Sequence, residues 1–143
     1  MHSETFIISE VKVVSLNNAY EFGRGRVFLR KEAKEYKTEI KRQIKAQLFD
    51  KKREFIKNIK PDDHLFVELI YSLLHEELYT LANKIRRRDL DNMHKLTIDG
   101  IFDAFNSVNP KMDDSQIMRK NAEKTTNKTS NQIIIKIGVE NHG

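Results

Sequence analysis

The sequence contains no cysteine and no long apolar run, and each absence excludes a class of protein. Without cysteine, the chain has neither a disulfide scaffold nor a cysteine-based zinc site, which fits a reducing compartment. No apolar run approaches the roughly 18 residues that a membrane-spanning helix needs. The first residues, MHSETFIISEVKVV, lack the basic start and the long apolar stretch of a signal peptide. We therefore expect a cytoplasmic protein that has no membrane partner.

The 143 residues carry a net charge of +5 that is unevenly distributed. Residues 1–60 contain 15 Lys and Arg and 8 Asp and Glu, a net of +7, whereas residues 61–143 contain 11 and 13, a net of −2. A basic half beside an acid-rich half suits a protein that holds a polyanion and also binds a cation, but charge alone favours the simpler account of ordinary solubility. The length is typical of one domain, so we expect residues 1–143 to form a single unit.

Hydrophobic periodicity predicts an α/β (α+β) protein with a small mixed sheet and two main helices. Residues 64–74, HLFVELIYSLL, are apolar at both alternating sets of positions, which is typical of a central strand. From Leu29 to Leu48, apolar residues recur at helical spacing beside a basic stripe. That stripe consists of Arg30, Lys34, Lys37, Lys41 and Lys45. The other expected elements are strands at 5–14, near Ile117 and at 131–140, a helix at 91–106, and loops at 15–26 and 106–116, with no structure assigned to 49–62.

The segment RRRDLDNMHK, residues 86–95, places three arginines directly before two aspartates that are two residues apart. An EF-hand loop is excluded, because the sixth position from Asp89 is His94 rather than Gly and the twelfth is Gly100 rather than Glu. The chain looks too short for a nucleotide-sugar transferase. A phosphatase-type nucleophile usually ends a hydrophobic strand, whereas here arginines precede Asp89.

Geometry suggests how the acids could meet. In extended chain Asp89 and Asp91 share a face, so the pair works best just before a helix that starts near Asp91. Inside that helix, Asp91, Lys95 and Asp99 align at four-residue spacing. A loop after the helix carries Asp113 and Asp114, and its return would bring Asp114 back toward Asp89 and Asp91.

Carboxylates gathered in this way repel one another unless a cation lies between them. Mg²⁺ takes one or two carboxylates, and when bound it can activate water and polarise a phosphoryl oxygen. Lys95 would then supply a fixed positive charge against the phosphate or help the attacking water. Spacing alone indicates a metal-dependent enzyme acting on a phosphate polymer. The alternatives left open are a solvated run for Arg86–Arg88, helix capping for the aspartates and an ordinary surface ion pair for Lys95.

The full pattern, RRRDLDNMHKLTIDGIFDAF followed by MDDSQI, resembles the RusA-type Holliday-junction resolvases, also called crossover junction endodeoxyribonucleases. The segments LNNAY and GRGRVFLRKEAKEYK near the N-terminus are also similar to that family. The resemblance implies a RusA-like α/β fold, a homodimer, and paired nicking of four-way DNA that depends on Mg²⁺, with Mn²⁺ as a substitute and no organic cofactor. The segment at 106–111, NSVNPK, replaces the glycine-containing turn expected in that family.

Carried over by position, the resemblance assigns roles to individual residues. Asp89, Asp91 and Asp114 match the metal-binding acids, and Lys95 matches the essential lysine. Asp99 and Asp113 are possible additional acids. The residues expected to hold DNA are Arg86, Arg87, Arg88, Arg24, Arg26, Lys34, Lys37 and Lys41.

The leading interpretation is a dimeric metal-dependent endodeoxyribonuclease that resolves Holliday junctions during DNA recombination and repair. A nuclease for flaps or forks is the first alternative, since the sequence does not separate the two. A junction-binding protein without catalysis is the second. The complete set of acids argues against it, because bare carboxylates hinder the binding of a polyanion.

Overall fold

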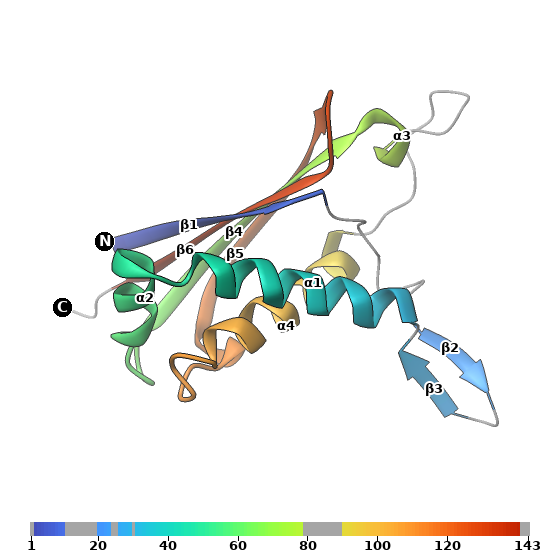
Figure 1. The fold of residues 1–143 in the computed structure, drawn as a ribbon. Helices are drawn as coiled ribbons and strands as arrows, with labels where there is room; N and C mark the ends of the chain where they lie inside the picture. Colours follow the sequence, from blue (N-terminus) through green and yellow to red (C-terminus); the bar gives the residue numbers. More distant parts are fainter. Residues whose placement is uncertain (1, 11–19, 24–25, 30, 79–89, 141–143) are drawn as a thin grey trace.

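The computed structural model describes residues 2–10, 20–23, 26–29, 31–78 and 90–140, with the backbone alone described at 20–23, 26–29 and 90–93. Its centre is a sheet of strands in the order β1 (His2–Ser9), β6 (Gln132–Glu140), β4 (His64–Leu74) and β5 (Ile117–Asn127). Helices α1 (Lys31–Gln47) and α4 (Leu90–Phe105) lie on one face of this sheet (Figure 1). The mixed sheet and two main helices confirm the predicted α+β class.

The connections of the sheet determine where the motif residues lie. Strand β6 runs antiparallel to both β1 and β4, whereas β4 and β5 are parallel neighbours. Parallel strands need a crossover connection, and here it consists of residues 75–116, which include the short helix α3 (His75–Leu78) and helix α4. The whole RRRDLDNMHK…MDDSQI segment, apart from its last residue, therefore lies in one connection between two adjacent strands.

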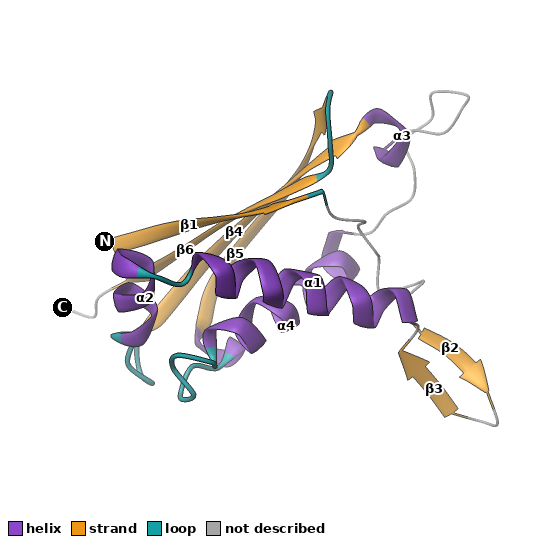
Figure 2. Cartoon of the chain, in the orientation of Figure 1, coloured by secondary structure: helices purple, strands orange, loops and turns teal. Residues whose placement is uncertain are grey.

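The core forms between the sheet and the two long helices (Figure 2). Alternate residues of β4, from Leu65 to Leu73, are at most 1% exposed and face the helices. Helix α1 buries Ala33, Tyr36, Ile40 and Ile44, which repeat at helical spacing. The two helices approach closely at Gly100, where an added Cβ would meet the Ile40 side chain at 3.1 Å. A larger residue at position 100 would push α4 away from α1.

The free edge of β1 is covered by side chains of α1. The amide of Gln47 accepts a hydrogen bond from Ile7 N at 3.1 Å and donates one to Ile7 O at 2.8 Å. Gln43 makes the same pair of bonds to Ser9, at 2.8 and 2.9 Å. An exposed strand edge is a template for pairing with another chain, and these two glutamines occupy half of it.

Several predicted elements agree with the structure. The strand at 64–74 has the predicted bounds, the helix expected at 91–106 spans Leu90–Phe105, and the helix expected at 29–48 spans Lys31–Gln47. The strand at 131–140 is β6, and the first strand ends at Ser9, with residues 11–14 outside the described part.

Other predictions were wrong. The expected loop at 15–26 contains β2 (Tyr20–Gly23), which pairs with β3 (Arg26–Leu29). The unassigned segment at 49–62 contains helix α2 (Asp50–Lys57), and the short strand near Ile117 extends to Asn127. Among the described residues, no helix is long and apolar enough to cross a membrane.

Candidate active site

Helix α4 presents two charged residues of the motif, Lys95 and Asp99, on a side that reaches solvent. The helix begins at Leu90, so Asp91 lies in its first turn. Lys95 is exposed and Asp99 is half-buried, one and two turns further along the same stripe. The opposite side buries Leu96 and Phe105 in the core, and this burial fixes which side of the helix reaches solvent. The predicted residues Asp89 and Arg86–Arg88 lie outside the described residues.

The second acid pair lies where the crossover ends. Asp113 precedes a short 3-10 helix, Asp114–Gln116, and its carboxylate accepts a hydrogen bond from Ser115 N at 3.0 Å. The side chain of Gln116 accepts from Asp113 N at 2.9 Å, which completes a capping box. The Asp113 carboxylate is therefore engaged in capping, whereas Asp114 is exposed in the first turn. This difference favours Asp114 as the acid that contacts a ligand.

Side-chain amides hold the loop that returns from α4 to Asp114. Asn106 donates to Asn109 O at 3.1 Å and to Met112 O at 2.8 Å. The buried Asn109 donates to Ile56 O at 2.9 Å and to Ile59 O at 2.8 Å, so the loop is tied to the end of α2. These bonds fix the loop at 106–111 without the glycine-containing turn that was expected there. Neither asparagine is among the predicted site residues.

The same segment of the chain also anchors the 3-10 helix. Gln116 is 8% exposed and donates to Lys60 O at 2.8 Å and to Asp63 O at 3.2 Å. Buried amides with several partners resist movement, because each displacement leaves polar groups unpaired. The position of Asp114 is thus fixed from residues 56–63 as well as from α4.

Asp114 interacts electrostatically with its neighbour Asp113 and with Asp99 of α4, and the 3-10 helix that carries it contacts α4. The pKa of Asp114 is raised above its ordinary value by its hydrogen bond with the Asp113 side chain, by burial, and by the negative charges of Asp113 and Asp99. The pKa of Asp113 is lowered, first by the Ser115 backbone N–H and then by the hydrogen bond from Asp114. The contribution of Asp99 means that the loop brings Asp114 within electrostatic reach of the acidic stripe of α4.

The donor chemistry at this place suits a hard divalent cation. Within the described part of the chain, no set of three His, Asp or Glu side chains is placed to hold a metal ion. Asp89 lies outside that part, and the Asp91 side chain is not described. The negative charge of Asp99 nevertheless acts on Asp114, a cation would relieve this repulsion, and Mg²⁺ prefers carboxylate oxygen ligands. These residues therefore fit the expected ion.

Lysines of α1 lie beside the acidic helix. Lys34, Lys37 and Lys41 line a hollow of about 240 Å³ together with Thr38 and with Asp103 of α4. Lys34 and Lys41 are exposed and Lys37 is half-buried. Of the arginines expected to bind DNA near the N-terminus, Arg26 lies in β3 and Arg24 lies outside the described residues.

A comparison with protein-family models identifies the relationship that this arrangement suggests. The model of the endodeoxyribonuclease RusA family matches residues 11–138, which is most of the chain. The chain belongs to the RusA family. No curated protein sequence matches the chain significantly. Membership of the RusA family makes this protein an endodeoxyribonuclease that acts on Holliday junctions.

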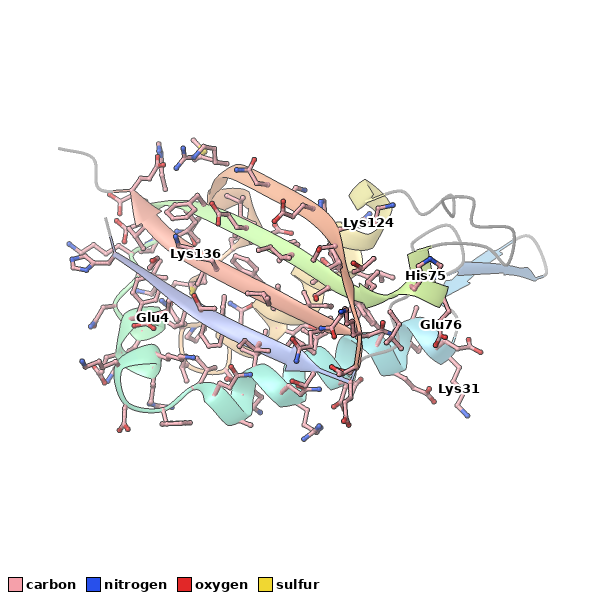
Figure 3. The ribbon with its side chains drawn as sticks, turned by 90° about the horizontal axis from the view of Figure 1, so that it is seen from above. Glu4, Lys31, His75, Glu76, Lys124 and Lys136 are labelled. Carbon is pink, nitrogen blue, oxygen red and sulfur yellow. The ribbon has the colours of Figure 1, made fainter. Side chains whose placement is uncertain are left out.

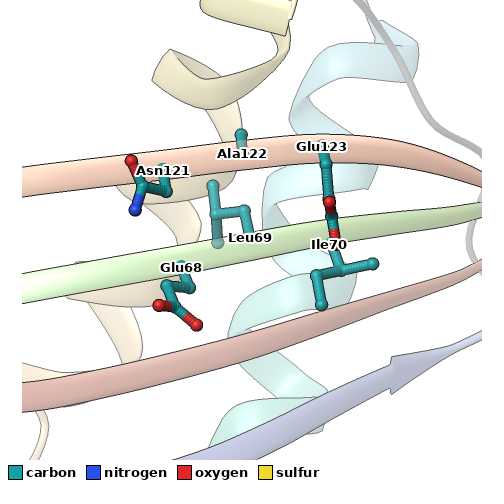
Figure 4. A pocket seen from close by; sticks show the side chains of 6 residues that line it. All are labelled: Glu68, Leu69, Ile70, Asn121, Ala122 and Glu123. Atoms are coloured by element: carbon teal, nitrogen blue, oxygen red, sulfur yellow. The ribbon is translucent and has the colours of Figure 1, made fainter.

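Another hollow, on the opposite face of the sheet, has the wrong chemistry for the substrate of a RusA enzyme. It has a volume of about 380 Å³ and lies over β4 and β5 (Figure 4). Its charged lining residues are Glu68 and Glu123, which would repel a DNA phosphate. The lysine-lined hollow between α1 and α4 is therefore the better candidate for contact with DNA.

Proposed function

We propose that this RusA-family protein resolves Holliday junctions by metal-dependent paired nicking, as a homodimer, during DNA recombination and repair. The observation that carries the proposal is that the 3-10 helix bearing Asp114 contacts α4, the helix that bears Asp99 and the exposed Lys95. A four-way junction is close to two-fold symmetric, and symmetric oligomers place identical sites around such an axis. Two copies of one site would give two matched incisions.

The proposed metal ligands are Asp89, Asp91 and Asp114, with Asp99 beside them and Asp113 orienting the loop. Bound Mg²⁺, or Mn²⁺ in its place, would supply Lewis acidity and a more acidic water. Lys95 supplies a positive charge that is available in solvent to a phosphate oxygen. Lys95 and Asp99 are held on a helix and Asp114 on an anchored loop, so these three groups are fixed before DNA arrives, which lowers the cost of reorganisation during reaction.

Among the proposed DNA contacts, those of the described side chains come from α1, on the helix side of the sheet. Lys34, Lys37 and Lys41 would neutralise backbone phosphates, as would the arginines at 24, 26 and 86–88. Phosphate contacts of this kind position the DNA without reading its sequence. The negative hollow on the open sheet face supports the same orientation, because DNA is disfavoured there.

The replacement Asp91→Asn tests the proposed chemistry. We expect cleavage of a synthetic four-way junction in Mg²⁺ to fall by about 100-fold or more, a loss typical of removing one preorganised electrostatic group. Junction binding, measured without divalent metal, should survive. Glu123→Gln, on the open sheet face, is the matched control and should cleave like the wild type. Nicking by Asp91→Asn at the wild-type rate would contradict the proposal.

Substrate comparison separates the proposed function from its alternatives. Symmetric paired incisions on the four-way form, with little cutting of three-way, flapped or linear DNA, would support junction resolution. Preferred cutting of a flap or fork would replace it with a different branched-DNA nuclease. Tight junction binding without incision in either Mg²⁺ or Mn²⁺ would indicate a binding protein. Solution mass decides the homodimer.

A further inference from the structure

Four polar side chains are buried together between α1, α4 and β4. Tyr36 of α1, Tyr71 of β4, and Thr97 and His94 of α4 are 3%, 0%, 0% and 4% exposed. The positions around them along each element are apolar, including Ile40, Leu69 and Ile101. A polar cluster in such a place is costly unless its members bind one another.

The cluster is a continuous hydrogen-bonded chain with Thr97 at its centre. The Tyr71 hydroxyl donates to Thr97 Oγ1 at 2.9 Å, and the hydroxyls of Tyr36 and Thr97 are 2.6 Å apart. The Tyr71 hydroxyl also lies 3.3 Å from His94 Nδ1, and the two rings stack with centroids 5.8 Å apart. Because the single Tyr71 proton is given to Thr97, the contact with His94 is a hydrogen bond only where Nδ1 carries the proton.

Burial raises the pKa of both tyrosines, so their hydroxyls stay protonated as donors. An apolar set of the same shape would fill this space without any polar group to satisfy. Hydrogen bonds between hydroxyls, unlike apolar contacts, depend on the orientation of the helix. A rotation of α4 by one residue, about 100°, would break every hydrogen bond of this cluster. Buried polar networks that are fully satisfied hold one arrangement of a core in this way.

The hydrogen-bonded cluster thereby fixes the positions of the groups proposed to react with DNA. Lys95 lies between His94 and Thr97 on α4, and Asp99 follows two residues later, so the anchored side of this turn sets the direction of its exposed side. Tyr36 lies on α1 directly before Lys37, and Lys37 is one of the residues that line the lysine-lined hollow. One chain of bonds therefore fixes the acidic helix and the basic helix relative to each other.

We propose that Thr97, held by Tyr36 and Tyr71, is a positioning residue for cleavage, which acts by fixing Lys95 and the acids of α4 against Asp114 and the lysines of α1. This inference rests on the proposed function, because it assumes that these groups perform the reaction. Outer residues that orient metal ligands typically change metal affinity or activity by about 10- to 100-fold when they are replaced.

The decisive variant is Thr97→Val, which keeps the shape of the side chain and removes the hydroxyl. We expect its single-turnover cleavage rate on a four-way junction to fall at least about tenfold and its half-saturating Mg²⁺ concentration to rise. Its junction Kd, measured without divalent metal, should stay within about twofold of the wild type, because no phosphate contact is lost. Thr97→Ser, which keeps the hydroxyl, should restore most of the rate. Thr125→Val, exposed on β5, is the matched control.

A purely structural role for Thr97 predicts a different pattern. Combining Tyr36→Phe with Thr97→Val removes both partners of one bond, and the melting temperature should then recover toward that of the wild type. Positioning requires the cleavage rate to stay low in this double variant. A rate that recovers together with the melting temperature would overturn the inference, as would a folded Thr97→Val that cleaves within about twofold of the wild type. If Thr97→Val does not fold, the double variant decides between the same two outcomes.

Mn²⁺ binding, followed by electron paramagnetic resonance, separates this inference from the proposed function. A wild-type chain that binds Mn²⁺ but cuts no DNA would end the proposed function. The inference would then stand if Thr97→Val weakens Mn²⁺ binding at least about fivefold, and would fall if the affinities are equal. A wild-type chain that neither cuts nor binds Mn²⁺ overturns both.

Discussion

Asp114 combines an exposed carboxyl with an unfavourable electrostatic position. Its pKa is raised because it shares a hydrogen bond with Asp113 and faces the charges of Asp113 and Asp99. When the pKa of a group is higher in the folded than in the unfolded protein, the folded protein becomes less stable as the pH rises from the lower to the higher of these two pKa values. At neutral pH the metal-free fold therefore carries the full cost of an ionised Asp114. Because a cation would remove that cost, the same residue that destabilises the empty site would strengthen metal binding.

The replacement Asp114→Asn should therefore stabilise the metal-free protein at neutral pH. The gain should stay within about 1 kcal/mol, because solvent screens an exposed carboxyl. It should vanish below the ordinary aspartate pKa of about 3.9, where the wild-type residue is neutral in both states. Thermal melts in EDTA, one series at neutral pH and one below the ordinary aspartate pKa, measure this gain in stability. In Mg²⁺ the order should reverse, since ligand binding stabilises only the wild type. Equal melting temperatures of Asp114→Asn and the wild type at neutral pH would contradict the expected stabilisation.

At the scale of elements, the sequence predicts the bounds of well-buried elements accurately and misses elements with few buried residues. Strand β4 was predicted at its observed bounds because both of its faces are largely apolar. Strand β5 was underestimated because it is an edge strand with mostly exposed residues, such as Arg119 and Thr125, which produce no apolar alternation. Helix α2 is eight residues long and fully buries only Ile56, which is too little for a periodic signal.

The same reasoning explains the limits of prediction at the site. The spacing of Asp91, Lys95 and Asp99 on one helix stripe follows from sequence, because it depends on local geometry. The anchors of the acid loop depend on partners 50 or more residues away, as in the bonds from Asn109 to Ile56 and Ile59. No local pattern distinguishes such an asparagine from an ordinary turn residue.

Asn109→Ala should loosen the loop that carries Asp114. Its amide donates to the backbone carbonyls of Ile56, Lys57 and Ile59, and leaving buried acceptors unpaired costs about 1–3 kcal/mol. We expect a lower free energy of unfolding in urea and a higher half-saturating Mg²⁺ concentration for cleavage. Asn121→Ala, exposed on β5, is the control and should change neither. A destabilised variant with unchanged Mg²⁺ dependence would separate the loop anchor from the metal site.

At the scale of the whole molecule, both sides of the sheet carry charges of both signs, but these charges are arranged differently. On the helix side, Lys34, Lys37 and Lys41 gather at one hollow with Asp103, whereas on the open side Glu68 lies beside Lys136 on the neighbouring strand. Figure 3 looks down on this sheet and labels Lys136 on β6. DNA that binds through phosphate contacts should therefore approach from the helix side.

Removing two lysines from the helix side should change the salt dependence of junction binding. For Lys37→Ala combined with Lys41→Ala, the slope of log Kd against log salt should fall by about 0.9 for each lost phosphate contact. Lys136→Ala, on the open side, should leave the slope unchanged. Fluorescence anisotropy with a labelled four-way junction over a range of salt concentrations measures both. If Lys136→Ala lowered the slope by the same amount, DNA would contact the open side of the sheet, which would contradict this prediction.

The position of β6 also has a consequence for how the protein is made. This strand comes after every other described strand in the sequence, yet it lies between β1 and β4 and pairs with both along most of its length. On the ribosome, β1 therefore has no sheet partner until residues 132–140 have been synthesised. Before β6 is made, the β4–β5 pair has no connection to β1, so α1 and α4 lack the middle of the layer against which they pack. A chain that ends before β6 should therefore not assemble an active nuclease.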